Sequence, residues 1–258
     1  MGFMSRYKEH GPRVFIAIPT MGVLHQRLVG LLIQLTRQHR NGLHITMVSQ
    51  AVPVDYARNH LVEEFLKTDL DWLLMIDSDI VPPDNVLDLT KHGKQIVGGV
   101  CLSLINGKLK STIFKETDSA SDGTRQYVQH DYMNDLGLVQ VDSTGTGCLA
   151  IHRDVFKKLD KPYFEFTYHA ESRKIRTGED IRFCEKARDA GFTIHVDKSV
   201  SCSHFKDCDL AWVNREVVNY MSKEKVDALV DGAIQRRIKQ LELNQDELAV
   251  APNGSGLR

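Results

Sequence analysis

The chain has 258 residues, with 33 lysines and arginines against 34 aspartates and glutamates, and 42% of its residues are hydrophobic. This balance excludes a wholly basic nucleic-acid-binding coat and a disordered acidic protein, and the length suits one large domain or two small ones. The five cysteines form no CxxC pair, so the pattern predicts neither a disulfide framework nor a zinc ribbon.

Strand-like and helical patterns alternate from the N-terminal end onward. Residues 14–18 (VFIAI) form a continuous apolar run that ends at Pro19, which is typical of a strand buried on both faces. Residues 44–48 are predicted to form the next strand, after a helix that ends at Asn41-Gly42. The apolar residues of that helix recur at helical spacing at Leu24, Leu28, Leu31, Leu32 and Leu35.

The same alternation continues to residue 100. Asp55 is placed to cap a second helix with a one-sided apolar stripe. The apolar run 72–76 (WLLMI) predicts a buried strand that leads directly into Asp77-Ser78-Asp79, and a helix after Pro82-Pro83 and a strand at 96–100 are expected next. These repeated units predict an α/β fold with a mainly parallel central sheet and helices on both faces.

Residues 105–135 interrupt this rhythm because they are rich in Lys, Thr, Ser, Asp and Gly. We expect them to be an insertion of short strands and surface loops. Strands are predicted again at 138–141, 148–151 and 193–196, and a helix is predicted over 181–190.

The C-terminal region has a different pattern. Residues 210 to about 243 are predicted to be mostly helical, with apolar residues on one face between Val226 and Leu241. Because an exposed apolar stripe is an aggregation hazard, we expect it to pack on the domain or on a second copy of the chain, and we favour a homodimer. The expected divisions are a domain over 1–209, a helical extension over 210–250 and a disordered tail over 251–258.

No apolar run approaches the roughly 20 residues that span a bilayer. Residues 1–13 are polar and lack the apolar core of a secretory signal. We therefore expect a cytoplasmic protein without a transmembrane segment.

Asp77 and Asp79 are the strongest local signal of chemistry. They follow a buried strand, which places them at the carboxyl edge of the sheet, where open α/β folds bind ligands. Alternate residues of an extended segment point to the same side, so both carboxylates can hold one hard cation. The alternative is a solvated acidic turn, but two charges beside a buried strand are costly without a counter-ion.

Gly178-Glu179-Asp180 stands at the start of the predicted helix 181–190. Its carboxylates could simply cap that helix and interact with the helix dipole. In the functional interpretation, one carboxylate is a general base, and repulsion between the two can raise the pKa of one of them.

Three further features are weak when each is taken alone. The turn from Thr144 to Gly147 has neither the lysine of a phosphate-binding loop nor the spacing of a dinucleotide fingerprint. Arg58-Asn59 lie in the first turns of their predicted helix, where an arginine can meet a phosphate. His204 follows a strand-like segment, although a lone histidine is more often structural.

In their order along the chain, these features resemble the motifs of the GT-A glycosyltransferases, especially the family-2-like nucleotide-sugar enzymes. The resemblance runs from about residue 13 to residue 205. It rests on the DxD element (Asp77, Ser78, Asp79), the glycine loop (Gly145, Thr146, Gly147), the xED element (Gly178, Glu179, Asp180) and the late histidine (His204). It implies a Rossmann-like GT-A fold and transfer of a sugar from a nucleoside-diphosphate donor, with a UDP-sugar expected, to an acceptor hydroxyl.

The resemblance also implies a role for each residue. Asp79 and His204 would hold Mn²⁺ or Mg²⁺ on the donor diphosphate, and Asp77 would hold the ribose or share the metal. Asp180 would be the general base of an inverting displacement, and Glu179 would help to place the acceptor, together with Gly145, Thr146 and Gly147. The donor would contact Pro19, Thr20, Asp55, Arg58, Asn59, Asp77 and Ser78.

Two other function classes remain open. A nucleotidyltransferase shares the sheet and the two-carboxylate metal site, but usually has a basic glycine-rich loop after the first strand, and residues 19–25 (PTMGVLH) contain no lysine or arginine. A non-catalytic module that binds sugars or nucleotides is the third class, and the presence of every motif argues against it. The acceptor stays open among a saccharide, a lipid-linked sugar, a protein and modified DNA.

Overall fold

The computed structural model describes residues 12–39, 42–49, 52–105, 108–117, 124–132 and 137–206. The expected helical extension, its homodimer and the tail after residue 250 lie outside these residues and stay predictions. Within the described ranges, no helix is both long and apolar enough to cross a membrane.

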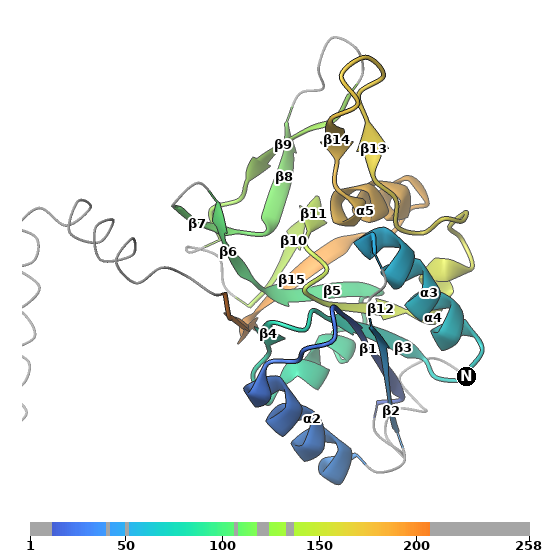
Figure 1. Ribbon diagram of the computed structural model, residues 1–258, viewed down its shortest axis with the longest axis vertical. Helices are drawn as coiled ribbons and strands as arrows, with labels where there is room; N and C mark the ends of the chain where they lie inside the picture. The colour runs from blue at the N-terminus through green and yellow to red at the C-terminus, as the bar shows by residue number, and fades with distance from the viewer. Residues whose placement is uncertain are drawn as a thin grey trace, which may run out of the picture. The chain divides into compact units, whose positions relative to one another are not determined.

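A seven-stranded mixed sheet forms the centre of the described fold, in the order β10-β15-β5-β12-β3-β1-β2 (Figure 1). Strands β2, β1, β3, β5 and β15 run in one direction, whereas β12 is antiparallel to β3 and β5, and β10 is antiparallel to β15. The strands are β1 (Val14–Thr20), β2 (Leu43–Ser49), β3 (Trp72–Ile76), β5 (Ile96–Val100), β10 (Leu138–Val141), β12 (Cys148–His152) and β15 (Ile194–Ser201).

The mainly parallel sheet expected from the sequence is therefore confirmed, except for β10 and β12. Parallel neighbours need a long crossover, usually a helix, to bring the chain back to the same end of the sheet. The described residues between β5 and β12 contain only strands and loops. The chain therefore enters β12 at the edge of the sheet where β5 ends, and β12 runs antiparallel to β5.

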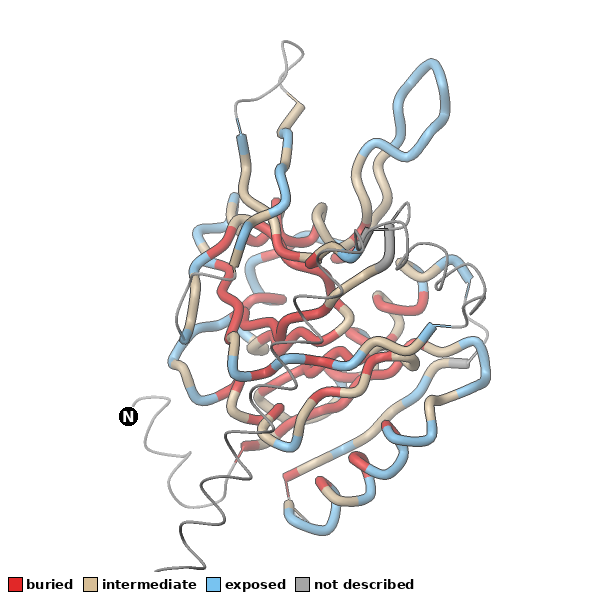
Figure 2. Tube along the Cα trace, turned by 90° about the vertical axis from the view of Figure 1, so that its left-hand side faces the viewer, coloured by how far each residue is buried: buried red, intermediate tan, exposed pale blue. Residues whose placement is uncertain are grey.

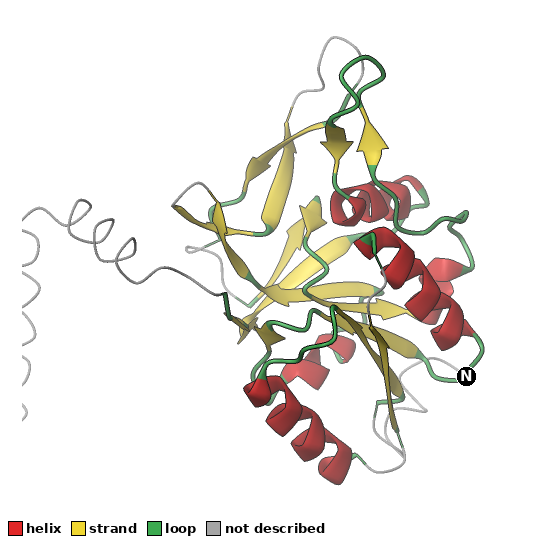
Figure 3. Ribbon diagram, viewed as in Figure 1, coloured by secondary structure: helices red, strands yellow, loops and turns green. Residues whose placement is uncertain are grey.

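Helices cover both faces of the sheet, as expected (Figure 3). Alternate residues of β1 show how the two cores form: Phe15 and Ala17 pack toward α3, whereas Ile16 and Ile18 pack toward α2. One face carries α2 (Gln26–Gln38) and the 3₁₀ helix η1 (Val86–Thr90). The other carries α3 (Val54–Leu66), α4 (Arg153–Phe156) and α5 (Glu179–Asp189).

The helix expected after Pro82-Pro83 is only the short η1. Its buried residues Val86, Leu87 and Leu89 fill the core, but Gly93 follows soon after with a φ of +66°, a conformation that ends helical structure.

Short strands surround the central sheet, and the expectation of short strands within 105–135 is confirmed by β7, β8 and β9. The pairs are β6 (Leu102–Ile105) with β7 (Lys108–Ser111), β4 (Ile80–Val81) with β16 (Ser203–His204), and β13 (Thr167–Tyr168) with β14 (Ile175–Thr177). A further sheet places β8 (Ile113–Thr117) between β11 (Ser143–Thr144) and β9 (Gln126–Gln129). Buried residues gather in the central sheet, and the β13–β14 hairpin is largely exposed (Figure 2).

Candidate functional site

The carboxyl end of β3 delivers Asp77-Ser78-Asp79 to the edge of the sheet, as the apolar run WLLMI predicts. All five residues of β3 are buried, so the chain can become polar only where the strand leaves the core. Directly after the acidic turn, β4 pairs with β16, with His204 opposite Ile80. This pairing brings Nε2 of His204 to 3.2 Å from Oδ2 of Asp79, across more than a hundred residues of sequence.

The His204 ring is held in one orientation by the backbone. Its Nδ1 lies 2.6 Å from the carbonyl oxygen of Leu102. Because a carbonyl only accepts, Nδ1 carries a proton. Nε2 faces Asp79: it donates to the carboxylate when the ring is protonated, and it offers a lone pair to a cation when the ring is neutral. A histidine whose second nitrogen donates to a backbone carbonyl is arranged as metal-binding histidines are.

Lys206 also reaches Asp79, with its Nζ 2.5 Å from Oδ2. Burial would raise the pKa of Asp79, but the hydrogen bond and charge of Lys206, together with His204, lower it below its ordinary value. Asp79 therefore remains an anion and can bind a cation.

Arg58 lies at the centre of the acidic side chains, with only 5% of its surface exposed. Its Nη1 is 3.2 Å from Oδ1 of Asp77, and its Nε is 3.2 Å from Oε1 of Glu179. Burial lowers the pKa of Arg58, but the charges of Asp77, Glu179 and Asp180 raise it overall. Although they are close enough for an ion pair, Nη1 and the Asp77 oxygen make no hydrogen bond of good geometry with the described residues.

Glu179 and Asp180 occupy the first turn of α5, where the helix dipole favours negative charge. Burial raises the pKa of Glu179, the charge of Asp180 adds to this effect, and Arg58 offsets only part of it. Burial also raises the pKa of Asp180, against the backbone N–H of Ile181, which donates to Oδ1 at 2.8 Å. A carboxylate with a raised pKa is a better proton acceptor, as a general base requires.

The glycine turn, residues 144–147, is hydrogen-bonded to the acidic turn, residues 77–79. The Gly147 carbonyl accepts a hydrogen bond from the backbone N–H of Asp77 at 3.0 Å. A Cβ at Gly147 would lie 3.3 Å from Ile80 and 3.4 Å from Asp77, and one at Gly145 would lie 3.0 Å from Thr112, so both positions favour glycine. Thr146 is buried. A role of this turn in acceptor binding stays a prediction.

Several predicted donor contacts are engaged in local structure. Pro19 is buried, and the Thr20 hydroxyl donates to the Val23 carbonyl at 2.9 Å. The Ser78 carbonyl accepts from the backbone N–H of His25 at 3.0 Å, which joins the acidic turn to the start of α2. These residues lie at the expected sheet edge, and their contact with a donor stays a prediction.

In α3, Asp55 and Asn59 make local contacts that differ from those expected. Asp55 does not cap the helix, because Val54 is already helical and the N-cap is Pro53; Asp55 accepts from the Tyr56 N–H at 2.9 Å instead. The Asn59 amide group has four hydrogen bonds. It donates to the Asp55 carbonyl within α3, and one donated and two accepted bonds tie α3 to residues 163–164. These four bonds use all the hydrogen-bonding capacity of the amide.

The sequence patterns missed two neighbours of the site. Lys206 could have been found as the first cation after His204. The second is a stack in which the rings of His25 and Phe205 lie 3.6 Å apart between centroids, with the Arg27 guanidinium 5.5 Å from the Phe205 ring. No sequence pattern indicates that stack.

The side chains at this edge of the sheet offer few ligands to a metal ion. Within the described residues, no group of three or more carboxylate, imidazole or thiol side chains is arranged around one cation position. Asp79 and His204 offer two neighbouring ligands, although the Lys206 ammonium contacts the same Asp79 oxygen and would have to move for a cation to bind there. Mg²⁺ and similar cations often take only one or two protein ligands when phosphate oxygens and water complete the shell, so the pair fits a cation that is bound together with a diphosphate.

Comparison with known proteins gives the fold. No protein-family model and no curated protein matches the sequence. Among solved structures, the chain is similar to A197 from STIV, with a TM-score of 0.54 and 20% identity over 76% of this chain and 86% of that chain.

Looser similarities link it to GalNAc-T7, crystallised with UDP, GalNAc and Mn²⁺, with a TM-score of 0.46 and 10% identity over 76% of this chain and 43% of that one. Another is the inositol-1-phosphate CTP transferase from T. maritima, with a TM-score of 0.39 and 13% identity over 83% of this chain and 80% of that one. The chain therefore has a mixed α/β fold similar to that of A197.

Proposed function

We propose that the protein is a metal-dependent glycosyltransferase that moves a sugar from a nucleoside-diphosphate donor, a UDP-sugar, to an acceptor hydroxyl with inversion. One observation carries the proposal. A carboxylate–imidazole pair suited to a cation follows β3, and Asp77, two residues before Asp79, is linked through Arg58 to two carboxylates of raised pKa.

Each side chain has a role in this proposal. Asp79 and His204 would hold Mn²⁺ or Mg²⁺, which neutralises the charge that grows on the leaving diphosphate. The Leu102 carbonyl keeps the His204 ring turned toward Asp79. Arg58 holds Asp77 and Glu179 in place from within the core.

Asp180 is the proposed general base. An acceptor hydroxyl is a weak nucleophile until its proton leaves, so a basic carboxylate has to face it from the side opposite the leaving group. The raised pKa of Asp180 suits this task, and Glu179 beside it would position the acceptor. The glycine turn and the residues at the end of β1 and the start of α3 would complete the donor and acceptor contacts.

A screen of nucleotide-sugars tests the proposal. Purified protein is incubated with UDP-, GDP- and TDP-sugars in Mn²⁺ or EDTA, and released nucleoside diphosphate is measured. We expect Mn²⁺-dependent release from a UDP-sugar, and Asp79→Ala should abolish it. Asp88→Ala is the matched control, because Asp88 also pairs with a lysine, Lys91, but lies on η1.

Other outcomes decide between the remaining classes. Pyrophosphate release from a nucleoside triphosphate and a sugar phosphate would assign a nucleotidyltransferase instead. Tight nucleotide-sugar binding without any turnover would indicate a binding module. If Asp79→Ala keeps the Mn²⁺-dependent turnover of the wild type, Asp79 is not a metal ligand.

A further inference from the structure

A cavity of about 330 Å³ lies between the β6–β7 hairpin and the segment that follows β9. Leu102, Leu109, Ser111 and residues 129–132 line it. Its volume is within the range of pockets that bind small molecules. None of these side chains has a role in the site described above.

The cavity borders that site through Leu102. The carbonyl of this residue orients His204, and β6, which begins at Leu102, contacts β16. On the other wall, the Thr112 carbonyl, next to Ser111, accepts from the backbone N–H of Gly145 at 2.9 Å. The cavity is thus joined by backbone contacts both to the candidate metal pair and to the glycine turn.

The lining combines apolar surface with hydrogen-bonding groups. Leu102, Leu109 and the Tyr132 ring offer apolar surface, and the Lys198 ammonium lies 5.8 Å from the centroid of that ring. The other lining side chains are a hydroxyl, an amide, an imidazole and a carboxylate, from Ser111, Gln129, His130 and Asp131. Gln129 is held against Ser111, because its Nε2 donates to the Ser111 carbonyl at 2.8 Å.

The apolar and hydrogen-bonding groups that line the cavity match the surface of a sugar. A sugar ring has C–H faces that pack on aromatic and aliphatic side chains, and hydroxyls that both donate and accept hydrogen bonds. Within the described residues, neither lysine nor arginine lines the cavity, so the lining offers a phosphate no cationic fork.

We propose that this cavity is a saccharide-binding site and that the saccharide it holds is the acceptor. The saccharide chemistry follows from the lining, whereas the acceptor role rests on the proposed function. The acceptor is accordingly a glycan, and a protein or a DNA acceptor is not expected to depend on the cavity.

Saturation-transfer NMR tests the proposal, with the methyl glycosides of glucose, galactose, mannose and N-acetylglucosamine as probes. We expect at least one of them to receive saturation through its ring protons. Tyr132→Ala should weaken its affinity at least tenfold. Tyr168→Ala is the matched control, since Tyr168 is an exposed tyrosine on the β13–β14 hairpin.

A second variant guards against misfolding of the first. Leu109 is 73% exposed, so Leu109→Arg should fold normally while its longer side chain obstructs the cavity, and it should also weaken binding at least tenfold. Absence of saturation transfer to all four glycosides, or unchanged affinity in both Tyr132→Ala and Leu109→Arg, would overturn the proposal.

Calorimetry of UDP with Mn²⁺ on the same proteins separates the two proposals. Saccharide binding without UDP–Mn²⁺ binding would leave the cavity as a saccharide site and refute a glycosyltransferase that uses a UDP-sugar. UDP–Mn²⁺ binding without saccharide binding would refute the saccharide site in the cavity but not the glycosyltransferase.

Discussion

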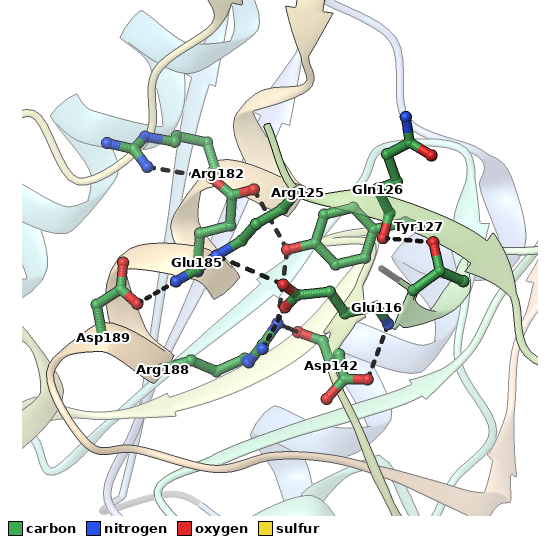
Figure 4. Close-up of polar contacts among 10 residues, drawn as sticks. Glu116, Arg125, Gln126, Tyr127, Asp142, Arg182, Glu185, Arg188 and Asp189 are labelled. Atoms are coloured by element: carbon green, nitrogen blue, oxygen red, sulfur yellow. Dashed lines mark hydrogen bonds and ion pairs between the residues drawn. The ribbon is translucent and has the colours of Figure 1, made fainter. Parts of the chain in front are cut away.

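The two ends of α5 carry polar clusters of different kinds. At the last turns, Glu185, Arg188 and Asp189 meet side chains from the inserted strands in an ion-pair network (Figure 4). At the first turn, Glu179 and Asp180 meet Arg58 and Asp77.

In the C-terminal network, Glu116, Glu185 and Asp189 each have an arginine partner. Arg188 pairs with Glu116 and donates to the Asp142 carbonyl at 3.3 Å. Arg125 bonds Asp189 at 2.6 Å, and the Tyr127 hydroxyl donates to Glu185 at 3.2 Å. Burial and the charge of Glu185 raise the pKa of Tyr127, so its phenol stays a donor at neutral pH.

The N-terminal cluster is unbalanced by comparison. Asp77, Glu179 and Asp180 all act on one arginine, Arg58, and the pKa values of Glu179 and Asp180 are raised. A buried carboxylate without a full set of cationic partners is a group that can take up a proton. The comparison indicates that one end of α5 is built for stability and the other for chemistry.

Replacing Arg58 should give the largest change in stability. Arg58→Met leaves buried carboxylates without their cation, and loss of one partner of a buried ion pair costs about 3–5 kcal/mol. Urea unfolding at pH 7 measures the effect. The loss should shrink at acid pH, where the carboxylates are neutral, and an unchanged unfolding midpoint would show that Arg58 does not balance them.

Arg188→Ala breaks the network at the other end of the helix. Loss of the Arg188–Glu116 ion pair and of the hydrogen bond to residue 142 should cost roughly 1–3 kcal/mol. The lower value is expected because the pair is partly exposed and Arg125 stays 3.7 Å from Glu116. Donor binding should be unaltered. Lys157→Ala, which breaks an exposed pair with Asp154, should leave the unfolding midpoint unchanged. A donor-binding defect in Arg188→Ala would contradict the division between the two ends.

Asp180→Asn should have the smallest effect on stability, and its sign depends on pH. A carboxyl whose folded-state pKa is raised contributes stability below its unfolded pKa and loses it as the pH rises through the folded pKa. Asparagine cannot titrate and can still accept from the Ile181 N–H. The unfolding free energy of the variant, relative to that of the wild type, should therefore increase as the pH rises from 4 to 7. A decrease would show that folding lowers the pKa of Asp180.

The sequence predicted the sheet better than its strand directions. Residues 14–18 and 72–76 are continuous apolar runs because both faces of β1 and β3 are covered, and the acidic turn followed directly from the second run. Strand β12 is also apolar, CLAIH, but nothing in those residues encodes whether it runs with its neighbours or against them. Direction depends on the connection.

The candidate site was only partly predictable. The contact of Asp79 with His204 depends on β4 and β16, strands of two residues each, which are too short to leave a periodic signal. Arg58 lies on the buried face of α3, three and four residues before Leu61 and Val62, and this position could have indicated a buried arginine. The raised pKa of Asp180 comes from burial, which local sequence does not specify.

The most direct test of the central claim compares turnover at the two ends of α5. With the donor identified by the nucleotide-sugar screen, Asp180→Asn should lower turnover by roughly 10²–10⁴-fold, as expected for a lost general base, while the donor dissociation constant stays within twofold. Arg188→Ala should keep wild-type turnover. Near-normal turnover in Asp180→Asn, or an equal loss in Arg188→Ala, would contradict the assignment of chemistry to the first turn.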